Sequence, residues 1–158
     1  MMVLLVTGGI GSGKTVVCRL IEEAGIPVYD SDSRAKALYD ADPLLLDAVK
    51  ELFGEDIIGD DGRLDRKKLA SRAFVSADAT ASLNAVVHPA VLRDFAKWKD
   101  SQSSETVVME SALAGTILGL PLTPTKLAFD GNNIVILGSY RDSTRYILGC
   151  IFYAKLKY

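Results

Sequence analysis

The apolar positions near the N-terminus fall into two patterns with different spacings. Residues 3–6 form a continuous apolar run, which is typical of a buried strand. A glycine-rich stretch follows, and apolar residues then recur at helical spacing over residues 14–24, with Gly25 where a helix would end. The pattern therefore predicts a strand, a loop and a helix.

The same alternation continues along the chain and indicates the fold class. Residues 27–29 are predicted to form a short second strand, and "DSDSRAKALYD" is typical of a polar turn that opens another helix. Two later apolar runs, residues 106–109 and 134–137, predict further strands. Strands that alternate with helices favour an α/β fold with a parallel β-sheet core.

Residues 42–104 have a different character, because helical segments joined by turns replace the strands. Two of these segments, "ATASLNAVV" and "HPAVLRDFAKWKD", are predicted as separate helices, with Pro89 in the first turn of the second. We therefore expect a helical lobe at residues 42–104, inserted into a core that consists of residues 1–41 and 105–158.

Composition and charge narrow the class of partner. The 158 residues are 49% hydrophobic, and 18 basic against 20 acidic side chains leave a formal net charge of -2. Without an overall positive field, we expect neither nucleic acid nor a membrane as a partner. The sequence has no apolar run of the roughly 20 residues that a membrane helix needs and no basic signal-peptide region, so we expect a cytoplasmic protein. Cys18 and Cys150 lack CxxC or metal-ligand spacing and are expected to be reduced thiols.

The stretch "VTGGIGSGKT" carries the clearest chemical motif. Its glycines, lysine and threonine match the phosphate-binding P-loop pattern, and it lies between a predicted strand and a predicted helix. The glycines let backbone N–H groups turn toward phosphate, Lys14 reaches the β- and γ-phosphates, and the Thr15 hydroxyl ligates Mg²⁺. The core is therefore predicted to bind a nucleoside triphosphate. The predicted site consists of Gly8, Gly9, Ile10, Gly11, Ser12, Gly13, Lys14 and Thr15.

Other residues distinguish a kinase from a GTPase. The nearest candidate for a guanine-reading motif, Thr125 and Lys126, lacks the aspartate, and "DIIG" at residues 56–59 lies in the helical lobe rather than after a strand. A kinase needs an acidic group that accepts the proton of the acceptor hydroxyl or organises Mg²⁺. Asp30 and Asp32 follow the second strand at its carboxyl end, where doubly wound sheets bind ligands. Capping of the following helix by Asp30, Ser31 or Asp32 is the alternative use of these polar residues.

Several segments together resemble one family of P-loop kinases. "TGGIGSGKT" is followed by "GIPVYDSDSRA", then by "LFGEDIIGDDGRLDRKKLASRAF" and "LNAVVHPAV", in the order typical of dephospho-coenzyme A kinases. The resemblance covers residues 1–111. It implies that ATP phosphorylates the ribose 3′-hydroxyl of dephospho-coenzyme A to give coenzyme A and ADP. It also implies a P-loop kinase fold whose inserted lobe binds the acceptor.

The resemblance also implies roles for individual residues. Asp32 resembles the family's catalytic aspartate, the base for the ribose hydroxyl and a Mg²⁺ ligand beside Thr15, while Lys14 is the other catalytic residue. His88 resembles the His-Pro element of the family, and a hydrogen bond to a local backbone group is its alternative use. Arg63, Arg66, Lys67 and Lys68 form a basic cluster in the lobe that suits an anionic acceptor, although clustered charges are more often a solvated face. The residues expected at the acceptor are Asp30, Asp32, His88 and Arg63.

The resemblance ends after "VVMESAL". The family pattern would continue toward an arginine-rich lid helix, whereas this chain reads "AGTILGLPLTPTKLAFDGNN". Arg141 and Arg145 have the i, i+4 spacing that places both on one helical face, so we expect them to be lid-like charges. A lid supplies positive charge to the transferred phosphoryl group. A nucleotide-binding degenerate or truncated kinase with little turnover is therefore the alternative function.

Overall fold

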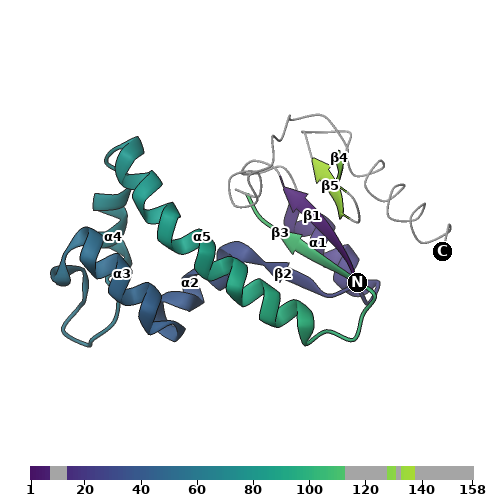
Figure 1. Cartoon of the computed structure of the whole chain (residues 1–158), viewed down its shortest axis with the longest axis horizontal. Coiled ribbons are helices and arrows are strands. Elements are labelled where there is room, and N and C mark those ends of the chain that lie inside the picture. The colour runs from purple at the N-terminus through teal and green to yellow at the C-terminus, as the bar shows by residue number, and fades with distance from the viewer. Residues whose placement is uncertain (8–13, 113–127, 131–132, 138–158) are drawn as a thin grey trace. The chain divides into compact units, whose positions relative to one another are not determined.

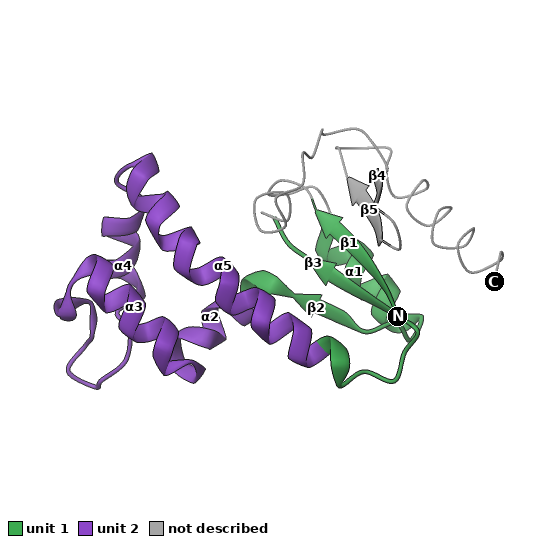
Figure 2. Ribbon diagram, in the orientation of Figure 1, with its two compact units in different colours: residues 1–32, 99–158 green, residues 33–98 purple. Residues whose placement is uncertain are grey.

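The computed structural model describes residues 1–7, 14–112, 128–130 and 133–137 (Figure 1). The chain divides into two compact units, which Figure 2 shows in different colours. Unit 1 comprises Met1–Asp32 and Lys99–Tyr158, and unit 2 comprises Ser33–Trp98. Within the described ranges, no helix is long and apolar enough to cross a membrane. The division into a nucleotide-binding core and an acceptor-binding lobe stays a prediction.

Unit 1 is built on a mainly parallel sheet with the strand order β2-β3-β1-β5-β4 among the described residues. The central strand β1 (Met2–Thr7) runs parallel to β3 (Thr106–Glu110) on one side and to β5 (Asn133–Leu137) on the other. Strand β2 (Val28–Asp30) is parallel to β3, and β4 (Ala128–Asp130) is antiparallel to β5. The expected α/β class with a parallel sheet is confirmed, whereas the strand β4 was not predicted.

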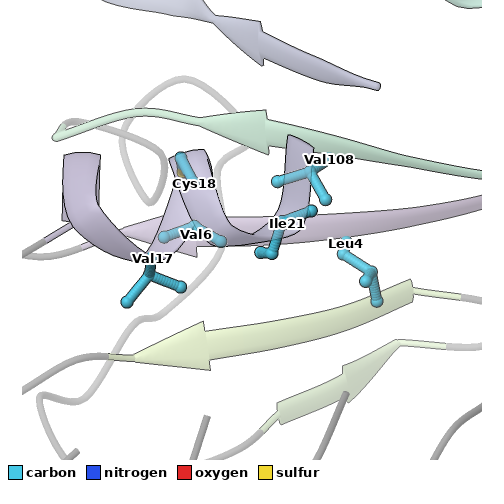
Figure 3. Close-up of a cluster of buried hydrophobic side chains, with 6 residues drawn as sticks. All are labelled: Leu4, Val6, Val17, Cys18, Ile21 and Val108. Carbon is cyan, nitrogen blue, oxygen red and sulfur yellow. The ribbon is translucent and has the colours of Figure 1, made fainter. Parts of the chain in front are cut away.

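Helix α1 (Lys14–Glu23) packs on one face of this sheet through the side that carries its apolar residues. The helix and the strands share one buried cluster, because apolar side chains of β1 and β3 meet those of α1 (Figure 3). The cluster consists of Leu4, Val6, Val17, Cys18, Ile21 and Val108. This packing fixes the start of α1 relative to the strands that precede and follow it.

The end of α1 is set by a glycine in a left-handed conformation. Gly25 has φ 81° and donates its N–H to the carbonyl of Glu22 at 2.8 Å, while the N–H of Ile26 bonds to the carbonyl of Ile21 at 3.2 Å. These two bonds form the Schellman motif, which satisfies carbonyl groups left open at a helix end. The predicted stop at Gly25 is confirmed.

Two helices of unit 2, α3 and α4, begin at aspartate caps. Helix α3 (Pro43–Phe53) follows Asp42, whose carboxylate accepts hydrogen bonds from two backbone N–H groups of the first turn at 3.1 and 3.3 Å. Helix α4 (Arg66–Ala73) follows Asp65, which makes the same contacts at 3.0 and 3.1 Å. A cap of this kind stabilises a helix by about 1 kcal/mol. The remaining helical elements are α2 (Ser31–Ala41), the 3-10 helix η1 (Glu55–Ile57) and α5 (Ala77–Asp100).

Helix α5 corrects one prediction from the sequence. The two segments that were predicted as separate helices form one helix, and Pro89 lies in its interior rather than in a first turn. Proline has no N–H to donate to the carbonyl of Ala85, which costs roughly 3 kcal/mol inside a helix. The helix continues because buried residues with helical spacing lie on both sides of the proline, whereas Pro89 itself is exposed. These buried residues are Leu83, Val87, Ala90 and Val91.

Two arginines join separate elements within unit 2. Arg34 donates to both carboxylate oxygens of Asp94, at 2.8 and 2.9 Å. Arg72 of α4 donates to both carboxylate oxygens of Asp56 in η1 and to the backbone carbonyl of Phe53 at the end of α3. The hydrogen bonds from Arg72 hold the pKa of the Asp56 carboxyl below its usual value. The Arg72 side chain therefore ties three consecutive elements together.

Candidate active site

Polar residues end three adjacent strands of the sheet in unit 1. Strand β1 ends at Thr7, β2 at Asp30 and β3 at Glu110. Glu110 is the register partner of Val6 on one side and of Asp30 on the other. Because the strands are parallel, these ends lie at one edge of the sheet, where α/β proteins bind ligands. We call this edge the carboxyl edge.

Helix α1 begins at this carboxyl edge, after the chain leaves β1. Its first residues are Lys14, which is half-buried, and Thr15, which is exposed. A helix N-terminus carries a partial positive charge, so the edge offers an electrostatically favourable place for phosphate. The other predicted P-loop positions, residues 8–13, lie outside the described residues.

The two aspartates of "DSDS" have different surroundings. The carboxylate of Asp30 accepts a hydrogen bond from the backbone N–H of Asp32 at 3.0 Å, which is the contact that a helix-capping side chain makes. Asp32 lies in the first turn of α2 and is exposed. Within the described ranges, no hydrogen bond or ion pair of the Asp32 carboxylate is found. The sequence left open which residue caps the helix, and the structure gives that contact to Asp30.

Ser31 connects the start of α2 to the end of β3. Its side chain is buried, and its hydroxyl donates a hydrogen bond to the backbone carbonyl of Glu110 at 2.7 Å. The two residues are 79 positions apart in the sequence, so no local pattern links them. Sequence reasoning treated Ser31 only as a possible cap, and its position between two aspartates gave no further signal.

Cys18 of α1 is buried close to the end of β3. Burial raises the pKa of Cys18 strongly, and the nearby carboxylate of Glu110 raises it further. The expectation that Cys18 is a reduced thiol agrees with its free, buried state. Sequence analysis did not include Glu110 among the site residues, although a polar residue at the end of a buried strand was the available signal.

The remaining sequence-predicted residues lie elsewhere. His88 is on α5 in unit 2, and its partial burial lowers its pKa. Arg63 is exposed in the loop before α4, and its backbone N–H bonds to the Asp61 carboxylate at 3.1 Å. Acceptor contact by His88 and Arg63 stays a prediction. Residues 141 and 145, the lid-like arginines, lie outside the described residues.

A match to a protein-family model shows to which family the chain belongs. A family model described as dephospho-CoA kinase matches residues 2–114, which include β1, α1, β2, the helices of unit 2 and β3. The chain belongs to the dephospho-CoA kinase family. The resemblance given by the sequence motifs is thereby confirmed.

The chain is also similar to individual dephospho-CoA kinases and to solved structures. The chain is 44% identical to a dephospho-CoA kinase from Porphyromonas gingivalis over 113 residues, which cover 72% of this chain and 55% of the relative. The structure of TT1252 from Thermus thermophilus has a TM-score of 0.62 and 34% identity, and the match covers 76% of this chain and 60% of that one. A dephospho-CoA kinase from Campylobacter jejuni shares the fold with a TM-score of 0.52, 19% identity and coverage of 73% of this chain and 61% of that one. The chain spans about half the length of the curated relatives it matches, 55% and 54% for two of them.

The family segment "GRLDRKK" has a visible structural use in this chain. Asp65 caps α4, and Leu64 beside it is buried. Arg66 donates to the backbone carbonyl of Lys36 at 3.1 Å and to the carboxylate of Asp40 at 3.3 Å. Arg66, one member of the basic cluster, is therefore engaged within the lobe itself.

Proposed function

We propose that this chain is an ATP-dependent kinase that phosphorylates the ribose 3′-hydroxyl of dephospho-coenzyme A. Membership of the dephospho-CoA kinase family supports the choice of ATP and of the acceptor. The observation that carries the proposal is the exposed Asp32 at the carboxyl edge from which α1 begins with Lys14 and Thr15. Strands β1 and β2 lie two positions apart in the sheet, or about 10 Å.

In the proposed reaction, Asp32, Lys14 and Asp30 act on different parts of the reaction. The acceptor 3′-oxygen forms a bond to the γ-phosphorus of ATP while the bond from that phosphorus to the bridging oxygen of ADP breaks. The proton of the 3′-hydroxyl passes to the Asp32 carboxylate, which is exposed and so accessible to an acceptor. Lys14 stabilises the negative charge of the β- and γ-phosphates. Asp30, by capping α2, fixes the backbone that carries Asp32.

The residues present fit a Mg²⁺ ion that arrives with the nucleotide. Among the described residues, no group of three or more His, Cys, Asp or Glu side chains could hold a metal ion. Mg²⁺ in a phosphate site keeps waters and uses one or two protein oxygens together with the phosphates, so no such cage is needed. The hydroxyl of Thr15 and the carboxylate of Asp32 are the proposed protein oxygens. When bound, Mg²⁺ neutralises charge on the phosphates.

The test of this function compares the two aspartates as asparagine variants. Asn cannot accept the proton, so we expect Asp32→Asn to lower kcat by roughly 10²-fold or more with ATP affinity nearly unchanged. Asn caps a helix about as well as Asp, so Asp30→Asn is the matched control and should retain most of the rate. ADP release is measured with dephospho-coenzyme A, and with adenosine and AMP as competing acceptors.

Three outcomes of this assay would contradict the proposal. If Asp30→Asn loses the rate and Asp32→Asn keeps it, the base is the other carboxylate. If adenosine or AMP is phosphorylated faster, the acceptor is wrong. If the wild-type chain binds Mg²⁺–ATP without turnover, the chain is a nucleotide-binding degenerate kinase, and the kinase proposal fails.

The nucleotide site is tested separately by Lys14→Ala. The substitution removes the cation proposed for the β- and γ-phosphates, so ATP affinity measured by calorimetry should fall at least about tenfold, a typical size for a charge-assisted contact. Affinity for adenosine, which has no phosphate, should not change. Equal ATP affinity of wild type and variant would remove the P-loop assignment.

The acceptor residues in unit 2 belong to the same proposal. Arg63 is exposed, so its guanidinium can pair with the anionic groups of the acceptor. His88 has a lowered pKa, so its neutral ring would contribute a hydrogen bond rather than a charge. We expect Arg63→Ala to raise KM for dephospho-coenzyme A and to leave KM for ATP unchanged. A parallel increase in both constants would place Arg63 outside the acceptor site.

A further inference from the structure

Helix α2, whose first turn carries the proposed base, has little apolar packing to hold it in place. Ser31 is the one fully buried residue of this helix, all of which the structure describes. The orientation of the first turn therefore depends on polar contacts. Two of them, the hydroxyl of Ser31 and the capping carboxylate of Asp30, lie at its start. A third contact joins Arg34 to Asp94 of α5.

The contact between Arg34 and Asp94 has the geometry of a strong ion pair. Within unit 2 (Figure 2), hydrogen bonds of 2.8 and 2.9 Å join the guanidinium to both carboxylate oxygens. The Asp94 side chain is only 18% exposed, because it lies one helical turn after the buried Ala90 and Val91. Exposed ion pairs of flexible side chains stabilise little, whereas a bidentate pair with a largely buried carboxylate has one preferred geometry. Arg34 therefore fixes the first turn of α2 against α5.

Arg34 is close to the proposed base in the chain, but the two side chains point to different sides. Residues two apart on a helix lie about 200° apart around its axis, so Arg34 does not face the same way as Asp32. The guanidinium is moreover engaged with Asp94. An effect of Arg34 on Asp32 must therefore pass through the backbone of the helix, as a change in its orientation.

We propose that Arg34 is a positioning residue: paired with Asp94, it holds the first turn of α2 so that the Asp32 carboxylate meets the acceptor hydroxyl. This inference rests on the proposed function. A general base acts only within hydrogen-bond reach of the proton that it accepts, and a displacement of about 1 Å can cost on the order of 10²-fold in rate. Without Arg34, the helix would still carry Asp32, but over a wider range of orientations.

The first experiment measures ADP release by the full chain with dephospho-coenzyme A and Mg²⁺–ATP. Arg34→Ala should lower kcat about tenfold and change KM for either substrate less than about twofold. Arg34→Lys keeps the charge but not the planar fork, so it should recover part of the loss. Arg93→Ala is the matched control, because it breaks the 3.5 Å ion pair of the neighbouring arginine on α5 with Asp42. The control should keep the wild-type kcat.

A second experiment separates positioning from a loss of stability. Arg34→Ala leaves the largely buried Asp94 carboxylate without its arginine, which should lower the temperature of thermal unfolding. Adding Asp94→Asn removes that charge and should raise this temperature again, whereas kcat should stay low because α2 is still not tied to α5. Hydrogen exchange at residues 31–41, followed by mass spectrometry, should be faster in both variants than in the wild type.

Each result decides for or against the positioning role. The role is overturned if Arg34→Ala keeps the wild-type kcat or the wild-type exchange in α2, if Arg34→Lys recovers nothing, or if Arg93→Ala loses as much rate. Recovery of kcat together with the unfolding temperature in the double variant also overturns it, and so does a higher KM for dephospho-coenzyme A at unchanged kcat. A wild-type chain without turnover rejects the proposed function and the role together, whereas a wild-type rate in Arg34→Ala rejects the role alone.

Discussion

Ser31→Ala is expected to weaken the connection between α2 and β3 by a predictable amount. Ser31 is 2% exposed, and its hydroxyl lies 2.7 Å from the backbone carbonyl oxygen of Glu110. Alanine leaves this carbonyl without that donor, and a buried acceptor that loses its partner costs roughly 1–3 kcal/mol. The better helix propensity of alanine returns at most about 0.5 kcal/mol. We therefore expect the free energy of unfolding to fall by about 0.5–2.5 kcal/mol.

Urea unfolding followed by circular dichroism measures this loss. Ser103→Ala is the matched control, because Ser103 belongs to the same unit and is exposed. The control should change the free energy of unfolding by less than about 0.5 kcal/mol. An unchanged m-value would show that both variants unfold as the wild type does. If Ser31→Ala has the same midpoint as the control, the reasoning from burial to stability is refuted.

Two further predictions concern unit 2. Arg72→Ala removes the donor to Asp56 and to the carbonyl of Phe53, so thermal unfolding should occur at a lower temperature. The pKa of the Asp56 carboxyl is lowered in the folded protein. The difference in unfolding temperature between wild type and variant should therefore be present above the ordinary aspartate pKa of about 3.9 and shrink below it. Equal unfolding temperatures of the two proteins at pH 7 would contradict the prediction. The pKa of His88 is lowered in the folded protein, because burial disfavours its charged form. The contribution of His88 to the free energy of unfolding is therefore fully present above pH ~6.5 and is lost as the pH falls through the lowered pKa. His88→Asn should lose less stability than the wild type between pH 7.5 and 5.5, and parallel curves would contradict this.

Local sequence signals predicted much of unit 1 because local physics determines those features. The apolar run of β1, the helical spacing of α1 and the left-handed Gly25 each depend on residues close in the chain. The P-loop motif predicted a phosphate site from the sequence, because its glycines, lysine and threonine in this order suit the binding of phosphate. The motif did not predict which aspartate caps α2, because Asp30 and Asp32 both have suitable side chains. Only the contact from the N–H of Asp32 separates them.

Features that depend on distant residues were missed or predicted wrongly. The hydrogen bond between the Ser31 hydroxyl and the carbonyl of Glu110 joins residues that are far apart in the chain, and no local periodicity predicts such a pair. Pro89 is a strong local signal for a helix start, yet tertiary burial of the residues on both sides of it outweighs that signal. The three-residue strand β4 is shorter than the pattern that predicts a strand.

The position of β3 in the sheet has a consequence for the order in which the protein folds. Strands β1 and β2 come first in the chain, but each pairs with β3 rather than with the other. A nascent chain on the ribosome therefore holds the P-loop motif and both aspartates long before Thr106 emerges and gives these two strands a shared neighbour. Closing such a long loop is entropically costly and slow compared with forming a helix. The ability to bind nucleotide should thus arise late in synthesis, in one step with the insertion of β3.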